Sequence, residues 1–295
     1  RILYNLGMIL LDWLMKIGSK QSGKLKLAVN GRKKTFDSIK SFREMHTGKL
    51  VWFHVASLGE YLQAKPVIAA FKKEHPHWAV AVSFFSPSGY EQVIKKKQDW
   101  VDFICYLPID RPKNAGQFID LLSPDMAFFI KYDLWANHIL AAKKKMIPLY
   151  LVAASFRAEQ VYFAWYGSFF RKLLSCFDHI FVQNEASLEL LERAGLKNIS
   201  LTGDPRFDNV YKTSLQPRLF PEIAHDITQK VMVLGSVWQE DMDNLIPFIN
   251  QSKDLQFIIA PHDINAGVIE NWQKAITLPS IKYSEFGKAG QSTAW

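Results

Sequence analysis

The fold is decided by the stretch Val51-Trp-Phe-His-Val-Ala-Ser-Leu-Gly-Glu60. An apolar run that suits a buried strand ends in a turn of small residues, and an amphipathic helix pattern follows over residues 61–73. A strand that leads at once into a helix begins a βαβ unit, in which the first turn of the helix lies at the carboxyl edge of a parallel sheet. The sequence therefore places the carboxylate of Glu60 at that edge.

Two interpretations of Glu60 remain open from the residues alone. The carboxylate is either a catalytic group that faces a ligand crevice, or an ordinary first-turn glutamate that the helix dipole favours.

Strand-like and helix-like segments alternate from residue 50 to residue 204, which predicts a parallel, doubly wound α/β sheet. The expected strands are 51–56, 79–85, 103–107, 126–130, 148–153, 179–182 and 199–202. Two further polar turns follow strands at the same edge, namely Ser86-Pro-Ser-Gly89 after the second and Ser155-Phe-Arg157 after the fifth.

A second α/β series follows, with strands expected at 231–234 and 256–260, a helix at about 239–250 between them, and a third strand shortly before Trp295. We expect an amphipathic helix at 1–22, a first Rossmann-like domain at 23–212, a linker at 213–230 and the start of a second such domain at 231–295, which looks incomplete. Two such domains would form a cleft that suits a ligand.

The first seventeen residues are apolar except for Arg1, Asn5, Asp12 and Lys16, which share one narrow stripe of a helix. The cations of this region are Lys16, Lys20, Lys24, Lys26, Arg32, Lys33 and Lys34. An apolar helix face backed by cations is typical of a segment on an anionic membrane surface. The alternative is a terminal helix that docks on its own core, with a solvated lysine tail. A signal peptide and a spanning helix are disfavoured, because the apolar stretch is short and contains Asp12.

The composition gives a net charge of +8, which favours an anionic partner. Cys105 and Cys176 lie in apolar runs and are expected to be buried free thiols in a reducing compartment. The histidines are scattered and no Cys/His cluster has metal-ligand spacing, so we expect no metal. A nucleic-acid partner is disfavoured because no recognition motif is present.

The motifs at the strand ends together resemble those of the bacterial 3-deoxy-D-manno-octulosonic acid (Kdo) transferases, lipid A-specific. The family's His-x-x-Ser-x-Gly-Glu motif is matched by His54, Ser57, Gly59 and Glu60. A second specific match is Gly203-Asp-Pro-Arg-Phe-Asp208, and a partial one is Lys131-Tyr-Asp-Leu-Trp-Ala-Asn137. The matches at Gly235-Ser236 and Pro261-His262 are weak alone.

This resemblance implies an inverting glycosyltransferase of the GT-B type, with two Rossmann-like domains, at the cytoplasmic face of the cell inner membrane. It would move Kdo from CMP-Kdo to the lipid A precursor (lipid IVA) in lipopolysaccharide core biosynthesis, without a cofactor. The implied roles are Glu60 as general base and Asp133 as a second acid; Ser57, Gly59, Lys131, Trp135 and Arg157 for the acceptor; and Arg206, Gly235, Ser236, Pro261 and His262 for the donor.

The chain departs from the family pattern at several positions. Lys131 stands where the family has the first of two acids, His262 where it often has arginine, and Arg206 where it has lysine. Trp135 suits a core as well as an acceptor site, and Arg157 suits a surface ion pair as well as a phosphate or carboxylate. No segment matches the Gly-Gly-His-Asn-x-x-Glu region that completes the family's nucleotide site, so we expect weak CMP binding by this chain.

Two rival functions remain. One is a GT-B transferase with another nucleotide-sugar donor, and the other is a non-catalytic protein of this fold that binds lipid or acts as a scaffold.

Overall fold

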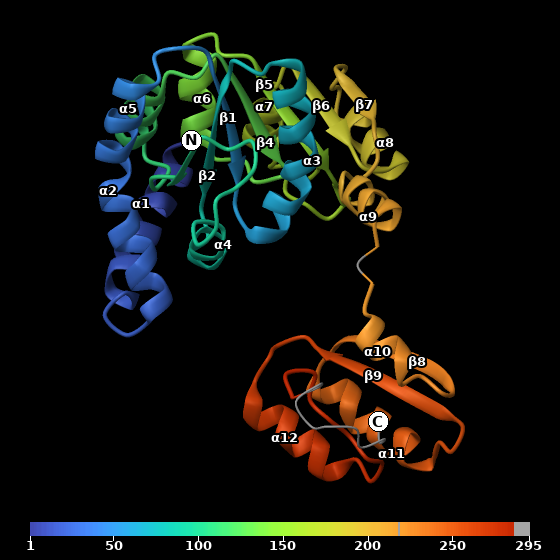
Figure 1. Cartoon of the computed structure of the whole chain (residues 1–295). Coiled ribbons are helices and arrows are strands. Elements are labelled where there is room, and N and C mark those ends of the chain that lie inside the picture. The colour runs from blue at the N-terminus through green and yellow to red at the C-terminus, as the bar shows by residue number, and fades with distance from the viewer. Residues whose placement is uncertain (218, 286–295) are drawn as a thin grey trace. The chain divides into compact units, whose positions relative to one another are not determined.

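The computed structural model describes residues 1–217 and 219–285. The chain divides into two compact units, Arg1–Leu215 and Gln216–Trp295. Each unit has its own sheet and helices (Figure 1). The boundary falls within the expected linker 213–230, which also contains a short helix, α10 (Pro221–His225).

Seven parallel strands form the sheet of the first unit. They are β1 (Leu50–Val55), β2 (Ala79–Phe84), β3 (Phe103–Tyr106), β4 (Met126–Ile130), β5 (Leu149–Ala154), β6 (His179–Val182) and β7 (Ile199–Leu201). Their order across the sheet is β3-β2-β1-β4-β5-β6-β7. All seven expected strands are present, and the predicted α/β, doubly wound fold is confirmed.

Helices cover both faces of this sheet. Those of the first unit are α1 (Ile2–Gly18), α2 (Gly23–Met45), α3 (Leu58–Glu74), α4 (Pro87–Val93), α5 (Pro112–Leu122), α6 (Ala136–Lys144), α7 (Ser168–Leu174), α8 (Glu185–Arg193) and α9 (Arg206–Leu215). Successive side chains of β1 point to opposite faces: Trp52 packs with α5 and α6, whereas Phe53 packs on the α3 side. The strand is buried throughout because both faces are covered.

The strand order reverses direction between β1 and β4, which are neighbours in the sheet. The chain leaves β1 toward β2 on one side, and it leaves β4 toward β5 on the other. The loops that follow these two strands therefore diverge, and the carboxyl edge between them is the usual ligand site of such sheets. The β1–α3 turn and residues 131–135 after β4 lie at this point.

Helix α2 was not expected from the sequence. Its buried residues Ala28, Arg32, Thr35, Ile39 and Phe42 recur at three- and four-residue spacing, so the helix packs one stripe on the sheet. The lysines of this segment are exposed as expected, but they lie on a packed helix rather than a tail. The placement of Arg32 among the surface cations is wrong, because Arg32 is only 8% exposed.

Part of the polar stripe of α1 contacts the rest of the first unit, while Arg1 and Lys16 are exposed. The Tyr4 hydroxyl donates to Asp110 at 2.6 Å, Asn137 Nδ2 donates to the Asn5 side chain at 2.9 Å, and Asp12 lies 3.5 Å from Arg111. These polar contacts hold the helix on the first unit.

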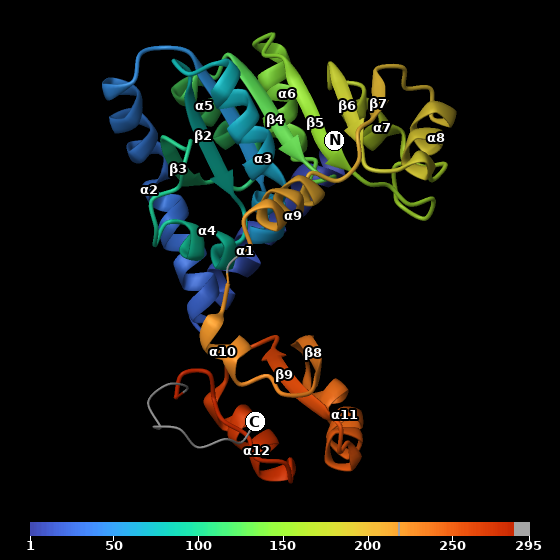
Figure 2. The same cartoon turned by 45° about the vertical axis from the view of Figure 1, so that its right-hand side comes forward.

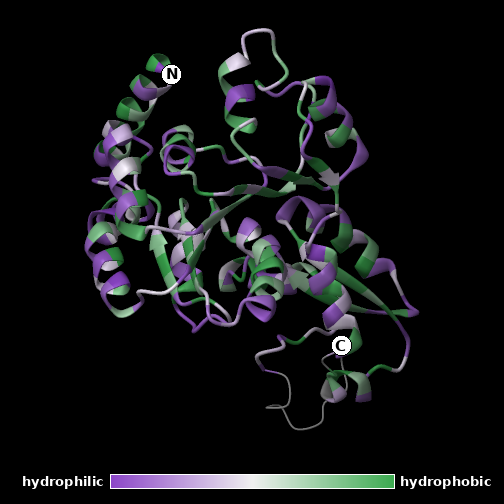
Figure 3. Ribbon diagram, turned by 90° about the horizontal axis from the view of Figure 1, so that it is seen from above, coloured by the Kyte–Doolittle hydropathy of each residue, from purple (hydrophilic) through white to green (hydrophobic). Residues whose placement is uncertain are grey.

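The opposite face of α1 is apolar and exposed; we call it the α1 apolar face. It consists of Ile2, Leu3, Leu6, Ile9, Leu10, Trp13, Leu14 and Ile17. Hydrophobic residues recur along this helix beside the N label in Figure 3. None of the helices in the described parts of the chain has the length and apolar character needed to cross a bilayer.

The second unit contains two parallel strands, β8 (Lys230–Val237) and β9 (Leu255–Pro261), with α11 (Gln239–Gln251) and α12 (Ala266–Ala275). Both expected strands and the helix between them are present. Residues 276–285 form no strand, and the rest of the segment expected to hold a third strand lies outside the described residues.

Both cysteines are free. Cys105 is buried as expected, but Cys176 is only half-buried, so the prediction for it was wrong.

Candidate active site

The turn between β1 and α3 fixes the position of Glu60. Ser57 is the N-cap residue of α3, and its hydroxyl accepts a hydrogen bond from the Glu60 backbone N–H at 3.4 Å. In return, Glu60 Oε2 accepts a hydrogen bond from the backbone N–H of Ala56. This reciprocal arrangement resembles a capping box, so Glu60 does serve the helix start.

The close hydrogen bond to the carboxylate is the one that Oε2 accepts from Ala56. The backbone N–H of Ser57 also interacts with the carboxylate, and both contacts lower the pKa of Glu60. A carboxylate positioned in this way by the backbone can accept a proton from a ligand.

The environment of Glu60 changes its protonation. The side chain is only 7% exposed, and burial, followed by the negative charge of Asp133, raises the pKa of Glu60 to about 7. The hydrogen bond from Ala56 and the charge of Lys131 oppose this rise. The carboxyl group is therefore close to half-ionised at neutral pH, where a general base works best.

The segment after β4 brings Lys131 and Asp133 to the same edge. Burial raises the pKa of Asp133, against the opposing charge of Lys131. Lys131 has a φ of 70°, a left-handed conformation that is costly for a residue with a side chain, and Ala153 at the end of β5 has a φ of 55°. Strained residues at neighbouring strand ends are typical of functional sites.

Gly89 packs directly against the Glu60 turn. A Cβ atom on Gly89 would lie 2.8 Å from the Leu58 backbone nitrogen and 3.2 Å from the Ser57 carbonyl carbon. Only glycine allows the start of α4 to approach this closely. The Ser86-to-Gly89 turn thus supports the site through the backbone.

Trp135 and His54 pack behind the site. The indole of Trp135 stacks on Phe85 at 4.3 Å and meets the edge of His54 at 6.2 Å. Burial lowers the pKa of His54 to about 3, so its ring is neutral, and both its Nδ1 and the Trp52 indole hydrogen-bond to Ser83. Trp135 packs on these neighbours but is only half-buried, so it stays a predicted acceptor residue, and His54 supports the core of the motif.

A buried polar cluster near α6 escaped the sequence interpretation. Asp110 is fully buried and accepts hydrogen bonds from the Tyr4 hydroxyl, the Asn137 and His138 backbone N–H groups and His138 Nδ1. Asn137, the last residue of the tryptophan motif, also binds Asn5. The sequence signal that could have revealed this cluster is Asp110 itself, a carboxylate that follows the third strand and stands just before Arg111 and Pro112.

The Gly203-to-Asp208 motif begins α9 and docks it on α3 (Figure 2). Gly203 has a φ of 81°, which explains the glycine. Arg206 is exposed and binds Asp204 at 2.6 Å, and Gln63 also donates to Asp204. Arg206 stays a predicted donor residue, with a local carboxylate as its present partner.

Arg157 is exposed in the loop after β5. The described residues place no carboxylate within ion-pair distance of its guanidinium, so the surface ion pair that the sequence left open is not formed there. Arg157 stays a predicted acceptor residue.

In the second unit, Gly235-Ser236 and Pro261-His262 come together. Gly235 and Ser236 lie in a bulge near the end of β8, three residues before α11, rather than in a turn beyond the strand. Ser236 Oγ lies 2.8 Å from His262 Nδ1, and the His262 ring stacks on Trp238 at 3.9 Å. The first turn of α11 already carries Glu240 and Asp241, so an anion there would depend on the Ser236–His262 pair.

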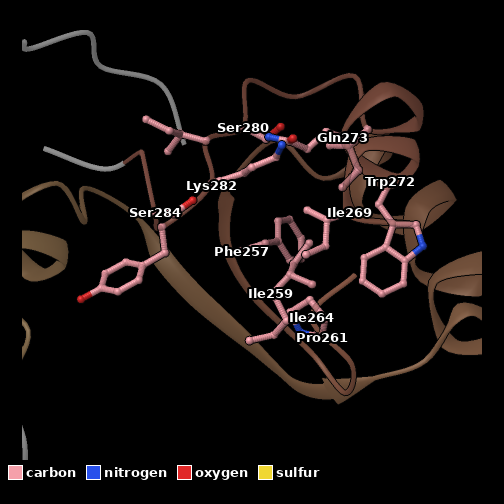
Figure 4. Close-up of a pocket in the computed structure, with 13 residues that line it drawn as sticks. Phe257, Ile259, Pro261, Ile264, Ile269, Trp272, Gln273, Ser280, Lys282 and Ser284 are labelled. Atoms are coloured by element: carbon pink, nitrogen blue, oxygen red, sulfur yellow. The ribbon is translucent and has the colours of Figure 1, made fainter. Parts of the chain in front are cut away.

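A hollow of about 380 Å³ also lies in the second unit (Figure 4). Its lining is mostly apolar and includes Ile259, Ile269 and Trp272. Of the predicted site residues only Pro261 lines it, and its polar lining includes Lys282 and Tyr283. The hollow therefore contains none of the predicted catalytic residues.

No metal centre is evident in residues 1–217 and 219–285. Nowhere there do three or more His, Cys, Asp and Glu side chains gather in an arrangement that could hold a metal ion.

A doubly wound sheet with a buried carboxylate at its switch point, followed by a second α/β unit, fits the GT-B class of fold. The family model "3-Deoxy-D-manno-octulosonic-acid transferase (kdotransferase)" matches residues 30–209, most of the first unit. The chain belongs to this family.

Curated relatives carry the same name. The 3-deoxy-D-manno-octulosonic acid transferase of Rickettsia prowazekii is 27% identical over 220 residues, covering 74% of this chain and 47% of the relative. That of Haemophilus influenzae is 23% identical over 217 residues, covering 72% and 47%. The chain thus spans about half the length of the curated relatives it matches.

Solved structures share the fold. A putative UDP-N-acetylglucosamine 2-epimerase from Listeria monocytogenes has a TM-score of 0.54 at 17% identity, covering 77% of this chain and 66% of that one. The UDP-GlcNAc 2-epimerase of Neisseria meningitidis has a TM-score of 0.53 at 16% identity, covering 80% and 73%. These similarities confirm the GT-B-type fold alone.

The raised pKa of Glu60 predicts a pH-dependent stability. Between pH 4.5 and about 7 the folded protein binds more protons at Glu60 than the unfolded chain does, so stability falls as pH rises through this window. Glu60→Gln keeps an acceptor for Ala56 but does not ionise. The free energy of unfolding of the variant minus that of the wild type should therefore become more positive by on the order of 2–3 kcal/mol between pH 4.5 and about 7. Urea unfolding at several pH values measures this difference. Parallel stability curves would contradict the raised pKa.

The close approach of Gly89 predicts a second effect. Gly89→Ala should destabilise the protein by about 1–3 kcal/mol, because the Leu58 backbone must move. Gly116→Ala in α5 is the matched control: its Cβ meets nothing within 4 Å, and it should be neutral or stabilising. Thermal unfolding of the two variants checks this, and equal melting temperatures would refute the packing argument.

Proposed function

We propose that this chain forms the acceptor side of an inverting glycosyltransferase that moves Kdo from CMP-Kdo to the lipid A precursor, lipid IVA. The observation that carries the proposal is the buried carboxylate of Glu60, with one oxygen bound to the Ala56 backbone and its pKa near neutrality. Family membership supports the class of sugar transferred. The donor and acceptor themselves are part of the proposal.

The proposed reaction is a single displacement at the anomeric carbon of Kdo. An acceptor hydroxyl oxygen forms the new bond to that carbon as the bond to the CMP phosphate oxygen breaks. Glu60 takes the hydroxyl proton, and the leaving phosphate keeps the electron pair. A sugar hydroxyl is a weak nucleophile, so proton acceptance in the transition state is the contribution asked of Glu60.

The neighbours of Glu60 tune this step. The negative charge of Asp133 makes Glu60 a stronger base, and the positive charge of Lys131 limits the effect. Lys131 would also attract an anionic acceptor to the edge where Glu60 lies. We assign acceptor contacts to Ser57, Gly59, Lys131, Trp135 and Arg157.

Donor binding is proposed for Arg206, Gly235, Ser236, Pro261 and His262. Neutral and cationic hydrogen-bond donors can stabilise the departing phosphate, so the proposal requires no cofactor and no metal.

We further propose that the protein acts at the cytoplasmic face of the inner membrane, with α1 lying on the lipid. The apolar face of α1 points away from the protein while its polar stripe is held by Asp110, Asn137 and Arg111. The lysines that follow α1 would meet anionic headgroups. A lipid acceptor would then be reached from the membrane surface.

Transfer of Kdo from CMP-Kdo to lipid IVA by the full gene product tests the proposal. Glu60→Gln should lower the rate by about 10²–10⁴-fold, and the wild-type rate should rise with pH around a midpoint near 7, because only ionised Glu60 accepts a proton. Glu74→Gln, at the exposed end of the same helix, should keep the wild-type rate.

Other outcomes of this assay identify the rival functions. Transfer from another nucleotide sugar but not from CMP-Kdo would support a different donor. Folded wild-type protein that binds lipid but transfers from no donor would support a scaffold.

Vesicle flotation tests the membrane proposal. Leu10→Glu and Trp13→Glu in the α1 apolar face should each weaken binding to phosphatidylglycerol vesicles about tenfold or more, because an inserted apolar side chain is lost. Met45→Glu, at an exposed apolar residue outside α1, is the control and should bind like the wild type. Equal loss in all three variants would refute the role of α1.

A further inference from the structure

A second hollow lies in the first unit between α1, α2 and the loop that leads from β3 into α5. Its volume is about 230 Å³, well above the ~10–15 Å³ that one water needs. The charged residues in its lining are the cations Lys16, Arg32, Lys33 and Arg111 and one acid, Asp12. This excess of positive charge in a concave site favours an anionic ligand.

Arg32 is a buried cation whose partners are all neutral. Its guanidinium donates to the backbone oxygens of Leu107 at 3.0 Å, Ala28 at 3.2 Å and Phe85 at 2.6 Å. In the part of the chain that the structure describes, no carboxylate lies within ion-pair distance of it. A buried charge without a counter-charge is costly, and two N–H groups of the guanidinium remain for another acceptor.

Asp12 does not neutralise this group of cations. A single oxygen of Asp12 lies 2.9 Å from Lys16 and 3.5 Å from Arg111. Two cations therefore share one carboxylate, and the charges of Arg32 and Lys33 remain in excess.

The start of α5 adds a second feature that favours an anion. The helix begins with Pro112, and no side chain caps its first turn. Arg111 and Asn114, from this same start, line the hollow. An uncapped helix start presents backbone N–H groups and the positive end of the dipole, which together favour phosphate.

We propose that this hollow binds a phosphate group, at a site separate from Glu60, with Arg32, Lys33, Arg111 and the start of α5 as its partners. Guanidinium groups match phosphate geometry by paired hydrogen bonds. The phosphate could belong to a membrane lipid headgroup or to free inorganic phosphate.

The position of the hollow on α1 bears on the source of the phosphate. Asp12, Met15 and Lys16 line it, and Trp13 and Ile17 of the α1 apolar face lie on the adjoining side of the same helix. The phosphate site itself does not depend on a membrane. Its assignment to a lipid headgroup does, because it rests on the proposed docking of α1 on a membrane.

Two arms of one experiment separate the sources. Calorimetry measures binding of inorganic phosphate, and flotation compares phosphatidylcholine vesicles with and without phosphatidic acid, using the full gene product. Lys33→Gln combined with Arg111→Gln should weaken binding about tenfold or more, because two charge-assisted contacts are lost. Lys95→Gln combined with Lys96→Gln removes the same charge from exposed positions after α4, outside the hollow and away from the lysines that follow α1, and should have little effect.

Each outcome decides the proposal. If the Lys33/Arg111 double variant alone loses binding of inorganic phosphate in calorimetry, the ligand is free phosphate. If that variant alone loses binding to vesicles that contain phosphatidic acid, and calorimetry shows no difference, the ligand is a lipid headgroup. Equal losses in both variants, or wild-type binding in neither arm, would overturn the site. If the double variant does not fold, Lys33→Glu, an exposed charge reversal, replaces it. Wild-type phosphate binding without any vesicle binding would contradict only the membrane docking of α1.

Discussion

The hydrogen bond from the Ala56 backbone N–H to Glu60 is the contact on which the site depends. It joins the end of a fully buried strand to the first turn of α3, so the carboxylate cannot move without disturbing both elements. Burial alone would push the pKa of this carboxyl upward, because a charge is poorly solvated there. The backbone N–H groups of Ala56 and Ser57 stabilise the ionised form and so oppose this rise. One contact thus serves as a helix cap and also sets the strength of a base.

The sheet topology explains why this carboxylate has charged neighbours. Parallel strands β1 and β4 pair directly, and the chain leaves them in opposite directions. Asp133 and Lys131 therefore reach the edge beside Glu60, although more than seventy residues separate them in sequence. Gly89 allows the next turn to close against the same edge. On the other side of the sheet, Asp110 joins the N-terminal helix to the start of α6, so the exposed apolar face of α1 is held in a fixed orientation on the first unit.

The sequence was sufficient for the strands and for Glu60 because both depend on local patterns. Apolar runs bounded by small or polar residues predicted the nine strands of the described residues, and the Ser-x-Gly-Glu turn placed the carboxylate. Helix α2 was missed because exposed lysines surround its buried stripe and because Arg32 and Thr35 interrupt the apolar pattern within it. Arg32 was placed in solvent for the same reason. Its burial depends on backbone oxygens of Phe85 and Leu107, which only the folded sheet brings near. The Asp110–His138 pair and the bulge at Ser236 likewise arise from contacts between distant segments.

The central claim is that Glu60 is a base poised near neutral pH by its position at the switch point of the sheet. The most direct measurement is a pH titration of the Glu60 carboxyl carbon by NMR in the wild type and in Asp133→Asn. The account predicts a midpoint near 7 in the wild type and a lower one in the variant, because the negative neighbour is removed. A wild-type midpoint near 4.5, unchanged by the substitution, would contradict it.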